Sequence, residues 1–159
     1  MAVDNFWVDL TDFGRLVAMT QTPPFDRRIL TDADLREHWQ CLMGEDGFSR
    51  RSLWLAFFDA DGLPAPTLVP IDDLPGEPAA ALGNSLDHIV AELRATTDIE
   101  SVAVLLSRPG SPAMTDGDRQ WARFLYDSSS LTSRWPVHLA TAGQVRVFAP
   151  DDLIGRLAG

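Results

Sequence analysis

The sequence predicts an α/β protein in which helices cover both faces of a mixed sheet. An unbroken apolar run from Val102 to Leu106 is typical of a strand that is buried on both faces. Apolar residues at helical spacing predict amphipathic helices before and after this run. The predicted elements follow the order helix, hairpin, helix, strand, helix, hairpin, helix, which favours a mixed sheet between two helical layers.

Composition excludes several classes of function. The chain has 159 residues, a formal net charge of -10 and no lysine. Without lysine, a Walker-type phosphate loop, a pyridoxal phosphate Schiff base and a lysine general base are excluded. The negative charge argues against nucleic acid and anionic membranes as partners. No apolar run approaches the roughly 20 residues that span a bilayer, so we expect no membrane segment.

The chain length fits one folded domain preceded by a short N-terminal segment. We interpret residues 31–159 as a single α/β domain and residues 1–30 as an N-terminal arm. The arm carries the apolar residues Phe6, Trp7 and Val8, and it either packs on its own domain or crosses to a second subunit. Exposed aromatic residues are typical of interfaces, so we expect a homodimer.

The expected compartment is the cytoplasm. The first residues, MAVDNFWVDL, are acidic where a secretion signal would be basic. The one cysteine, Cys41, has no second cysteine with which to form an internal disulfide, which agrees with a reducing compartment.

The first part of the domain predicts a helix and then a hairpin. Thr31 followed by Asp34 is a helix-capping pattern, and the helix ends before Gly44. The apolar run Ser52–Asp59 predicts a strand, the Asp-Gly pair at its end predicts a tight turn, and Pro66–Ile71 predicts the returning strand. Three prolines place this returning strand at or near an edge of the sheet.

The second part predicts a crossover helix, the buried strand and another helix. The crossover helix ends near Thr96 and begins either after Pro78 or at a cap formed by Asn84 or Ser85. After the buried strand, a Pro/Gly turn leads to a helix that opens with the capping pair of Thr115 and an acid three residues later.

The last part predicts a second hairpin. Residues 128–135 read as a connector, Pro136–Thr141 and Val145–Phe148 as paired strands, and a final short helix begins at Pro150. We expect a site in the loop after the buried strand, because such loops carry the sites of α/β sheets.

The element order, with the buried strand leading to a Pro/Gly turn and a Thr-x-x-Asp, resembles the RadC-like branch of the JAB/MPN metal-dependent hydrolase family. The similarity covers about residues 48–149: LWLAFFDADG is similar to the family's first hairpin, LDHIVAELRATT to its crossover helix, and SVAVLLSRPGSPAMTDGD to its metal-motif segment. The resemblance implies a three-layer architecture like that of cytidine deaminases. The chain also resembles a group of actinobacterial proteins with the segments RRSLWL, DADG and PIDD, a likeness that implies no activity.

The resemblance implies a metal site that this chain has lost. Leu106 and Arg108 fall where the family has its zinc histidines, Arg51 falls where it has its catalytic glutamate, and Thr115 and Asp118 fall on its Ser-x-x-Asp. Catalytic zinc takes about three protein ligands, and only Asp118 remains. We therefore expect no metal, no cofactor and no catalytic residue, and a candidate cleft formed by Arg51, Ser107, Arg108, Thr115 and Asp118.

Three functional hypotheses follow for this cleft. The first is a non-catalytic JAB-like domain that binds a protein partner or a small ligand. The second is a metal-independent enzyme in which Asp118 is the acid/base and Arg51 and Arg108 hold an anion. The third is a purely structural or assembly protein. An arginine can replace the charge of a lost cation, so we predict that Arg51 or Arg108 binds Asp118; the other interpretation is that Asp118 only caps its helix.

Overall fold

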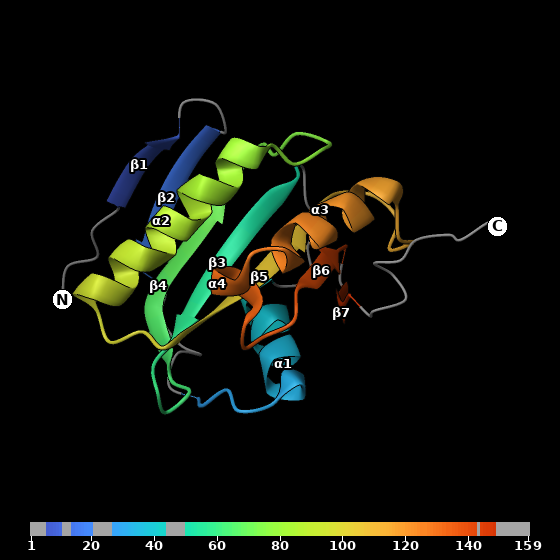
Figure 1. Cartoon of the computed structure of the whole chain (residues 1–159). Coiled ribbons are helices and arrows are strands. Elements are labelled where there is room, and N and C mark those ends of the chain that lie inside the picture. The colour runs from blue at the N-terminus through green and yellow to red at the C-terminus, as the bar shows by residue number, and fades with distance from the viewer. Residues whose placement is uncertain (1–5, 11–13, 21–26, 44–49, 143, 149–159) are drawn as a thin grey trace.

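One mixed sheet organises the protein (Figure 1). The computed structural model describes residues 6–10, 14–20, 27–43, 50–142 and 144–148. Within these ranges the strands are β1 (Phe6–Leu10), β2 (Gly14–Thr20), β3 (Ser52–Phe58), β4 (Pro64–Ile71), β5 (Ser101–Ser107), β6 (His138–Thr141) and β7 (Gln144–Val147). The helices are α1 (Asp32–Met43), α2 (Ala80–Thr96), α3 (Asp116–Tyr126) and α4 (Ser129–Thr132).

The sheet has the strand order β1-β2-β4-β3-β5-β6-β7. β5 pairs with β6 in parallel and with β3 in antiparallel, and the other neighbouring strands pair in antiparallel. The predicted α/β class with a mixed sheet is therefore confirmed. β5 lies inside the sheet, and all of its residues from Val102 to Ser107 are buried, as the apolar run predicted.

Two apolar layers cover the two faces of the sheet. Leu53 and Leu55 of β3 share one buried cluster with residues of α2 and α3. Ala56 and Phe58 belong to a second cluster, which contains Trp39 of α1. Because successive residues of a strand point to opposite faces, these clusters lie on opposite sides of the sheet. Figure 1 shows the same arrangement, with α2 and α3 over one face and α1 at the other.

The N-terminal residues extend the sheet. β1 and β2 pair with each other, and β2 then pairs with β4, so part of the predicted N-terminal arm is strand. β4, which was expected at or near an edge, is third in the strand order and has β2 and β3 as its neighbours. Prolines remove backbone N–H donors from β4, which favoured a place near an edge, but they do not indicate that residues 14–20 pair with this strand. β4 also begins at Pro64, two positions before the predicted Pro66.

The helix starts follow local capping. At α1, the Asp34 amide donates to Thr31 Oγ1 at 3.1 Å and the Thr31 amide donates to the Asp34 carboxylate at 3.1 Å, which confirms the predicted cap. α2 begins at Ala80 after Pro78, so Asn84 and Ser85 do not cap it. The predicted connector 128–135 contains the short helix α4. Gly44 and the helix predicted from Pro150 lie outside the described residues.

Among the described residues, no helix combines the length and the apolar character that crossing a membrane requires.

Candidate functional site

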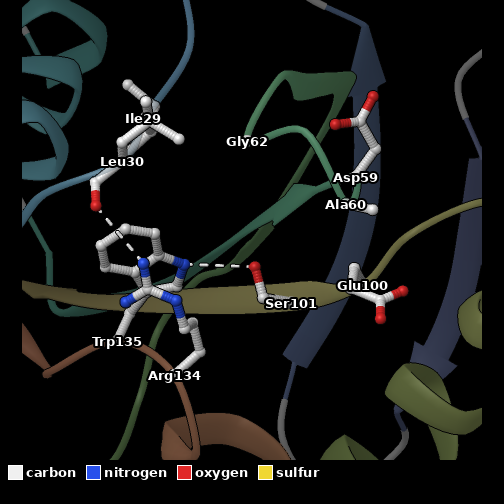
Figure 2. A pocket seen from close by; sticks show the side chains of 9 residues that line it. All are labelled: Ile29, Leu30, Asp59, Ala60, Gly62, Glu100, Ser101, Arg134 and Trp135. Atoms are coloured by element: carbon white, nitrogen blue, oxygen red, sulfur yellow. Dashed lines mark hydrogen bonds between the residues drawn. The ribbon is translucent and has the colours of Figure 1, made fainter.

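The two ends of β5 carry the two candidate sites of the protein. The carboxyl end runs directly into Arg108 and the loop 109–115 before α3, where the sequence predicted a cleft. The amino end begins at Ser101, which lines a pocket together with the β3–β4 turn (Figure 2). We call these places the carboxyl-end pair and the amino-end pocket.

At the carboxyl end, Arg108 forms a two-point ion pair with Asp118. Arg108 Nε donates to Asp118 Oδ1 at 2.7 Å, and Nη2 donates to Oδ2 at 2.8 Å. Asp118 is 0% exposed and Arg108 is 4% exposed. Two parallel charge-assisted bonds between planar groups form the strongest common geometry for such a pair. The predicted bond between an arginine and Asp118 is confirmed, and Arg108 is the arginine that makes it.

The remaining N–H groups of Arg108 hold the loop that follows it. Nη1 donates to the carbonyl oxygens of Pro109 at 3.0 Å and Ser111 at 2.8 Å, and Nη2 donates to that of Ala113 at 2.8 Å. A guanidinium has five N–H donors, and Asp118 takes the other two. Every donor of Arg108 therefore has a partner inside the protein, and none is left for a bound anion.

Asp118 also caps α3, so both interpretations of this residue hold together. The Thr115 amide donates to Asp118 Oδ2 at 3.0 Å, and the Asp118 amide donates to Thr115 Oγ1 at 3.1 Å. Burial by itself would raise the pKa of Asp118, but the bonds from Arg108 and Thr115 together with the Arg108 charge leave that pKa below its usual value. The carboxylate is thus an anion with both oxygens engaged.

Ser107 does not join the carboxyl-end pair. Its hydroxyl accepts a hydrogen bond from Trp54 Nε1 at 2.9 Å, and Trp54 packs against the cluster on the α1 side of the sheet. Arg108 follows Ser107 directly and turns to the α3 side, because neighbouring residues along a strand alternate between faces. The sheet therefore separates Ser107 from the other residues of the predicted cleft.

Arg51 lies near the start of α3 and does not bind Asp118. A Cβ placed on Gly117 would lie 3.6 Å from Arg51 Nη2, and one on Gly76 would lie 3.8 Å from Nη1. Arg51 Nε is buried and makes no hydrogen bond within the described part of the chain. Arg51, Thr115, Arg108 and Asp118 thus share one end of the sheet, but only the last three are linked by hydrogen bonds.

The residues at the carboxyl end do not fit a zinc ion. Both Asp118 oxygens accept hydrogen bonds, Leu106 has no donor atom, and a guanidinium is always charged and offers no lone pair. In the described ranges, no three His, Cys, Asp or Glu side chains gather into a group that could hold a metal ion. His138, the first residue of β6, pairs with Leu105 of β5, and burial lowers its pKa to about 4, so it is a neutral core residue.

The amino-end pocket has a volume of about 170 Å³ and combines a buried apolar floor with a charged rim. Ile29 and Trp135 are 1% and 3% exposed, whereas Leu30 is 58% exposed. Figure 2 shows the Trp135 ring and the Arg134 guanidinium on one side, and Asp59, Ala60 and Glu100 on the other.

Hydrogen bonds fix the walls of the pocket. Trp135 Nε1 donates to Ser101 Oγ at 3.2 Å, and Arg134 stacks on the Trp135 ring at 3.8 Å from its centroid. Arg134 Nη2 donates to the Leu30 carbonyl oxygen at 3.3 Å. The Ile29 amide donates to the Gly62 carbonyl oxygen at 2.8 Å, which ties residues 29–30 to the β3–β4 turn. The floor is therefore preformed.

The two carboxylates of the rim differ in their bonding. Asp59 Oδ1 accepts hydrogen bonds from the amides of Asp61 and Leu63, so Asp59 shapes the turn, as the sequence predicted for an Asp-Gly hairpin. Glu100 is exposed, and no hydrogen bond or ion pair engages its carboxylate within the described residues. The sequence does not indicate this pocket, because its lining comes from four segments that only the fold brings together.

No protein-family model matches the chain, and no curated protein matches it at a significant level.

Proposed function

We propose that this chain is a cytoplasmic, non-catalytic JAB-like domain that works by binding a protein partner or a small ligand. The order of helix, hairpin, helix, strand, helix and hairpin, together with the Thr-x-x-Asp after the Pro/Gly turn, supports the JAB-like proposal. The single cysteine, which is exposed and free, supports the proposed compartment.

One observation supports the non-catalytic proposal above all others. The carboxyl-end pair has a saturated guanidinium and a buried carboxylate with both oxygens engaged. A general acid/base needs contact with a substrate proton, and an anion clamp needs a free N–H. Asp118 and Arg108, two of the three residues of the enzyme hypothesis, meet neither condition, because a substrate would first have to break their buried ion pair.

The size of the amino-end pocket supports binding to a protein over binding to a large ligand. Sites for drug-sized molecules usually measure about 300–1,000 Å³. A pocket of about 170 Å³ is close to the volume of one protruding side chain. The pocket also exposes Arg134, and arginine is one of the residue types that dominate protein interfaces.

Metal analysis tests the proposal directly. We expect the purified protein to contain no stoichiometric zinc and to keep the same melting temperature with and without a strong chelator, because its carboxyl end offers no ligand set. About one zinc per chain, removed by the chelator with a loss of stability, would overturn the proposal.

We also propose that the protein self-associates. β1, which carries the apolar residues Phe6–Val8, is at the end of the strand order among the described strands. An edge strand offers unpaired backbone groups to a second chain. Light scattering should give the mass of a dimer at micromolar concentration, and a monomer mass would remove this proposal.

A further inference from the structure

We propose that the amino-end pocket receives a protruding arginine or lysine side chain of a protein partner. This inference rests on the proposed function, since it names the chemistry of the partner and the place where it binds. The pocket is separate from the carboxyl-end pair, because it opens beside Ser101, the first residue of β5, whereas Arg108 follows the last.

The shape of the pocket fits a long side chain with an apolar stem. The apolar surface that the pocket offers to such a stem comes from Leu30, which is 58% exposed, and from the exposed Ala60, while Ile29 and Trp135 lie beneath with 1% and 3% exposure. Arginine and lysine lay their methylene stems on apolar surface and keep the charged head near water. A pocket of about 170 Å³ holds one such side chain.

The charges on the rim select a cation. The Glu100 amide donates to the Phe58 carbonyl oxygen at 2.7 Å, so Glu100 lies beside the end of β3 and close to Asp59. The pocket lining thus contains two carboxylates and one guanidinium, that of Arg134, which lies on the opposite side of the pocket. Asp59 Oδ1 already accepts hydrogen bonds from two amides of the β3–β4 turn, while the Glu100 carboxylate has no partner in the described chain. A cationic head at the rim gains its pairing from Glu100 first.

Arg134 already shows how a cation binds in this pocket. Its guanidinium stacks on Trp135 and donates to the Leu30 carbonyl oxygen. Cations over an indole face gain an attraction of about 0.5–1 kcal/mol at exposed sites. Arg134 therefore competes with the partner's side chain for the Trp135 face, and it repels an incoming cation.

The charge of the whole chain acts in the same direction. The formal net charge is -10, so the long-range field attracts basic surfaces and speeds their encounter with this protein. The proposal commits to a basic protein segment. An acidic segment that pairs with Arg134 is the opposite case, and the test separates the two.

A peptide titration followed by NMR tests the proposal. The probes are acetylated and amidated peptides in which one arginine, lysine, norleucine or glutamate is flanked by alanines. The reporter is the indole N–H of Trp135, identified with a Trp135→Phe variant. We expect the arginine and lysine peptides to shift this signal with dissociation constants on the order of 1 mM, and the norleucine and glutamate peptides to bind more weakly.

Two substitutions should change the affinity for the arginine peptide in opposite directions. Glu100→Gln should weaken binding of the arginine peptide by about threefold, because an exposed ion pair contributes up to about 1 kcal/mol. Arg134→Gln should strengthen it, because the competing cation is gone. Glu77→Gln is the matched control: Glu77 is also exposed, but it lies beside Gly76 at the opposite end of the sheet, and its substitution should change nothing.

The opposite pattern would overturn the proposal. Preferential binding of the glutamate peptide, weakened by Arg134→Gln, would show an acidic partner. No shift of the Trp135 indole signal with any peptide would show that the pocket is not a docking site. Neither result touches the non-catalytic proposal, which the zinc analysis tests separately.

Discussion

The two ends of β5 contain the same kinds of side chain and use them in opposite ways. Each end has an arginine, an acidic residue and a nearby turn. At the carboxyl end, Arg108 is buried and all its donors are used inside the protein. At the amino end, Arg134 is exposed and Glu100 has no partner in the described chain. Residue type alone therefore does not decide which end binds another molecule.

Burial decides the roles because it changes the cost of separating charges. A buried carboxylate without its partner is costly, so the carboxyl-end pair holds the loop and α3 together and stays closed. An exposed carboxylate is hydrated and gives up little when it binds a new cation. The carboxyl end is a structural clamp, and the amino end is the surface that we propose for binding.

The largest expected effect comes from breaking the carboxyl-end pair. Asp118→Asn leaves Arg108 buried without a counter-charge, so the free energy of unfolding should fall by about 3–5 kcal/mol. Asp116→Asn is the control: Asp116 is 93% exposed in its ion pair with Arg119, and its loss should cost about 0–1 kcal/mol. Urea unfolding measures both variants. Equal effects would mean that the buried pair is no more important than the surface pair.

As the pH falls, the protein should lose stability through its two buried histidines before Asp118 is protonated. Burial lowers the pKa of His38 and His138 to about 4, from an unfolded value of 6.5. The unfolded chain therefore binds more protons than the folded chain between these values, and stability is fully present above pH 6.5 and is lost as the pH falls toward 4. The slope is about 1 kcal/mol per pH unit for each histidine.

Asp118 of the carboxyl-end pair is protonated only at a pH below its usual pKa, so its effect can be separated from that of the histidines. The pKa of Asp118 is below its usual value of 3.8, so its contribution is present above that value and is lost only as the pH falls through the lower, folded pKa. Urea unfolding at several pH values should show that the free energy of unfolding falls with the same slope per pH unit in the wild type and in Asp118→Asn between pH 6.5 and 5. A slope that disappears in Asp118→Asn would assign the acid sensitivity to the pair.

A smaller effect is expected at the turn that supports the pocket. Gly62 has a φ of +84°, and a Cβ there would lie 2.8 Å from the Ile29 carbonyl oxygen. Gly62→Ala should lower the free energy of unfolding by about 1–3 kcal/mol. Gly76→Ala, where the nearest atom to the new Cβ is 3.8 Å away, should be close to neutral. Thermal melts of the two variants check this, and a neutral Gly62→Ala would mean that the turn adapts freely.

More of the carboxyl-end pair than of the amino-end pocket could be predicted from the sequence, for a physical reason. Arg108, Thr115 and Asp118 lie within one short loop and the first turn of a helix, so local capping and charge rules apply to them. The pocket joins residues 29–30, 59–62, 100–101 and 134–135, and nothing local marks them as neighbours.

The errors at the carboxyl end have a similar origin. Ser107 was expected in the cleft, but alternation along β5 turns it to the other face, where Trp54 donates a hydrogen bond to it. The pairing of β4 with β2 was not predicted, because β2 comes from a distant part of the chain. Pairing partners that are far apart in sequence leave no trace in local composition.

NMR of the arginine side chains tests the central claim most directly, because it compares both ends in one sample. The account predicts that the Arg108 Nε–H exchanges slowly with water and does not shift when inorganic phosphate is added, whereas the Arg134 Nε–H exchanges fast. Rapid exchange at Arg108, together with a shift of its signal on phosphate addition, would contradict the account and return the carboxyl end to the role of an anion-binding site.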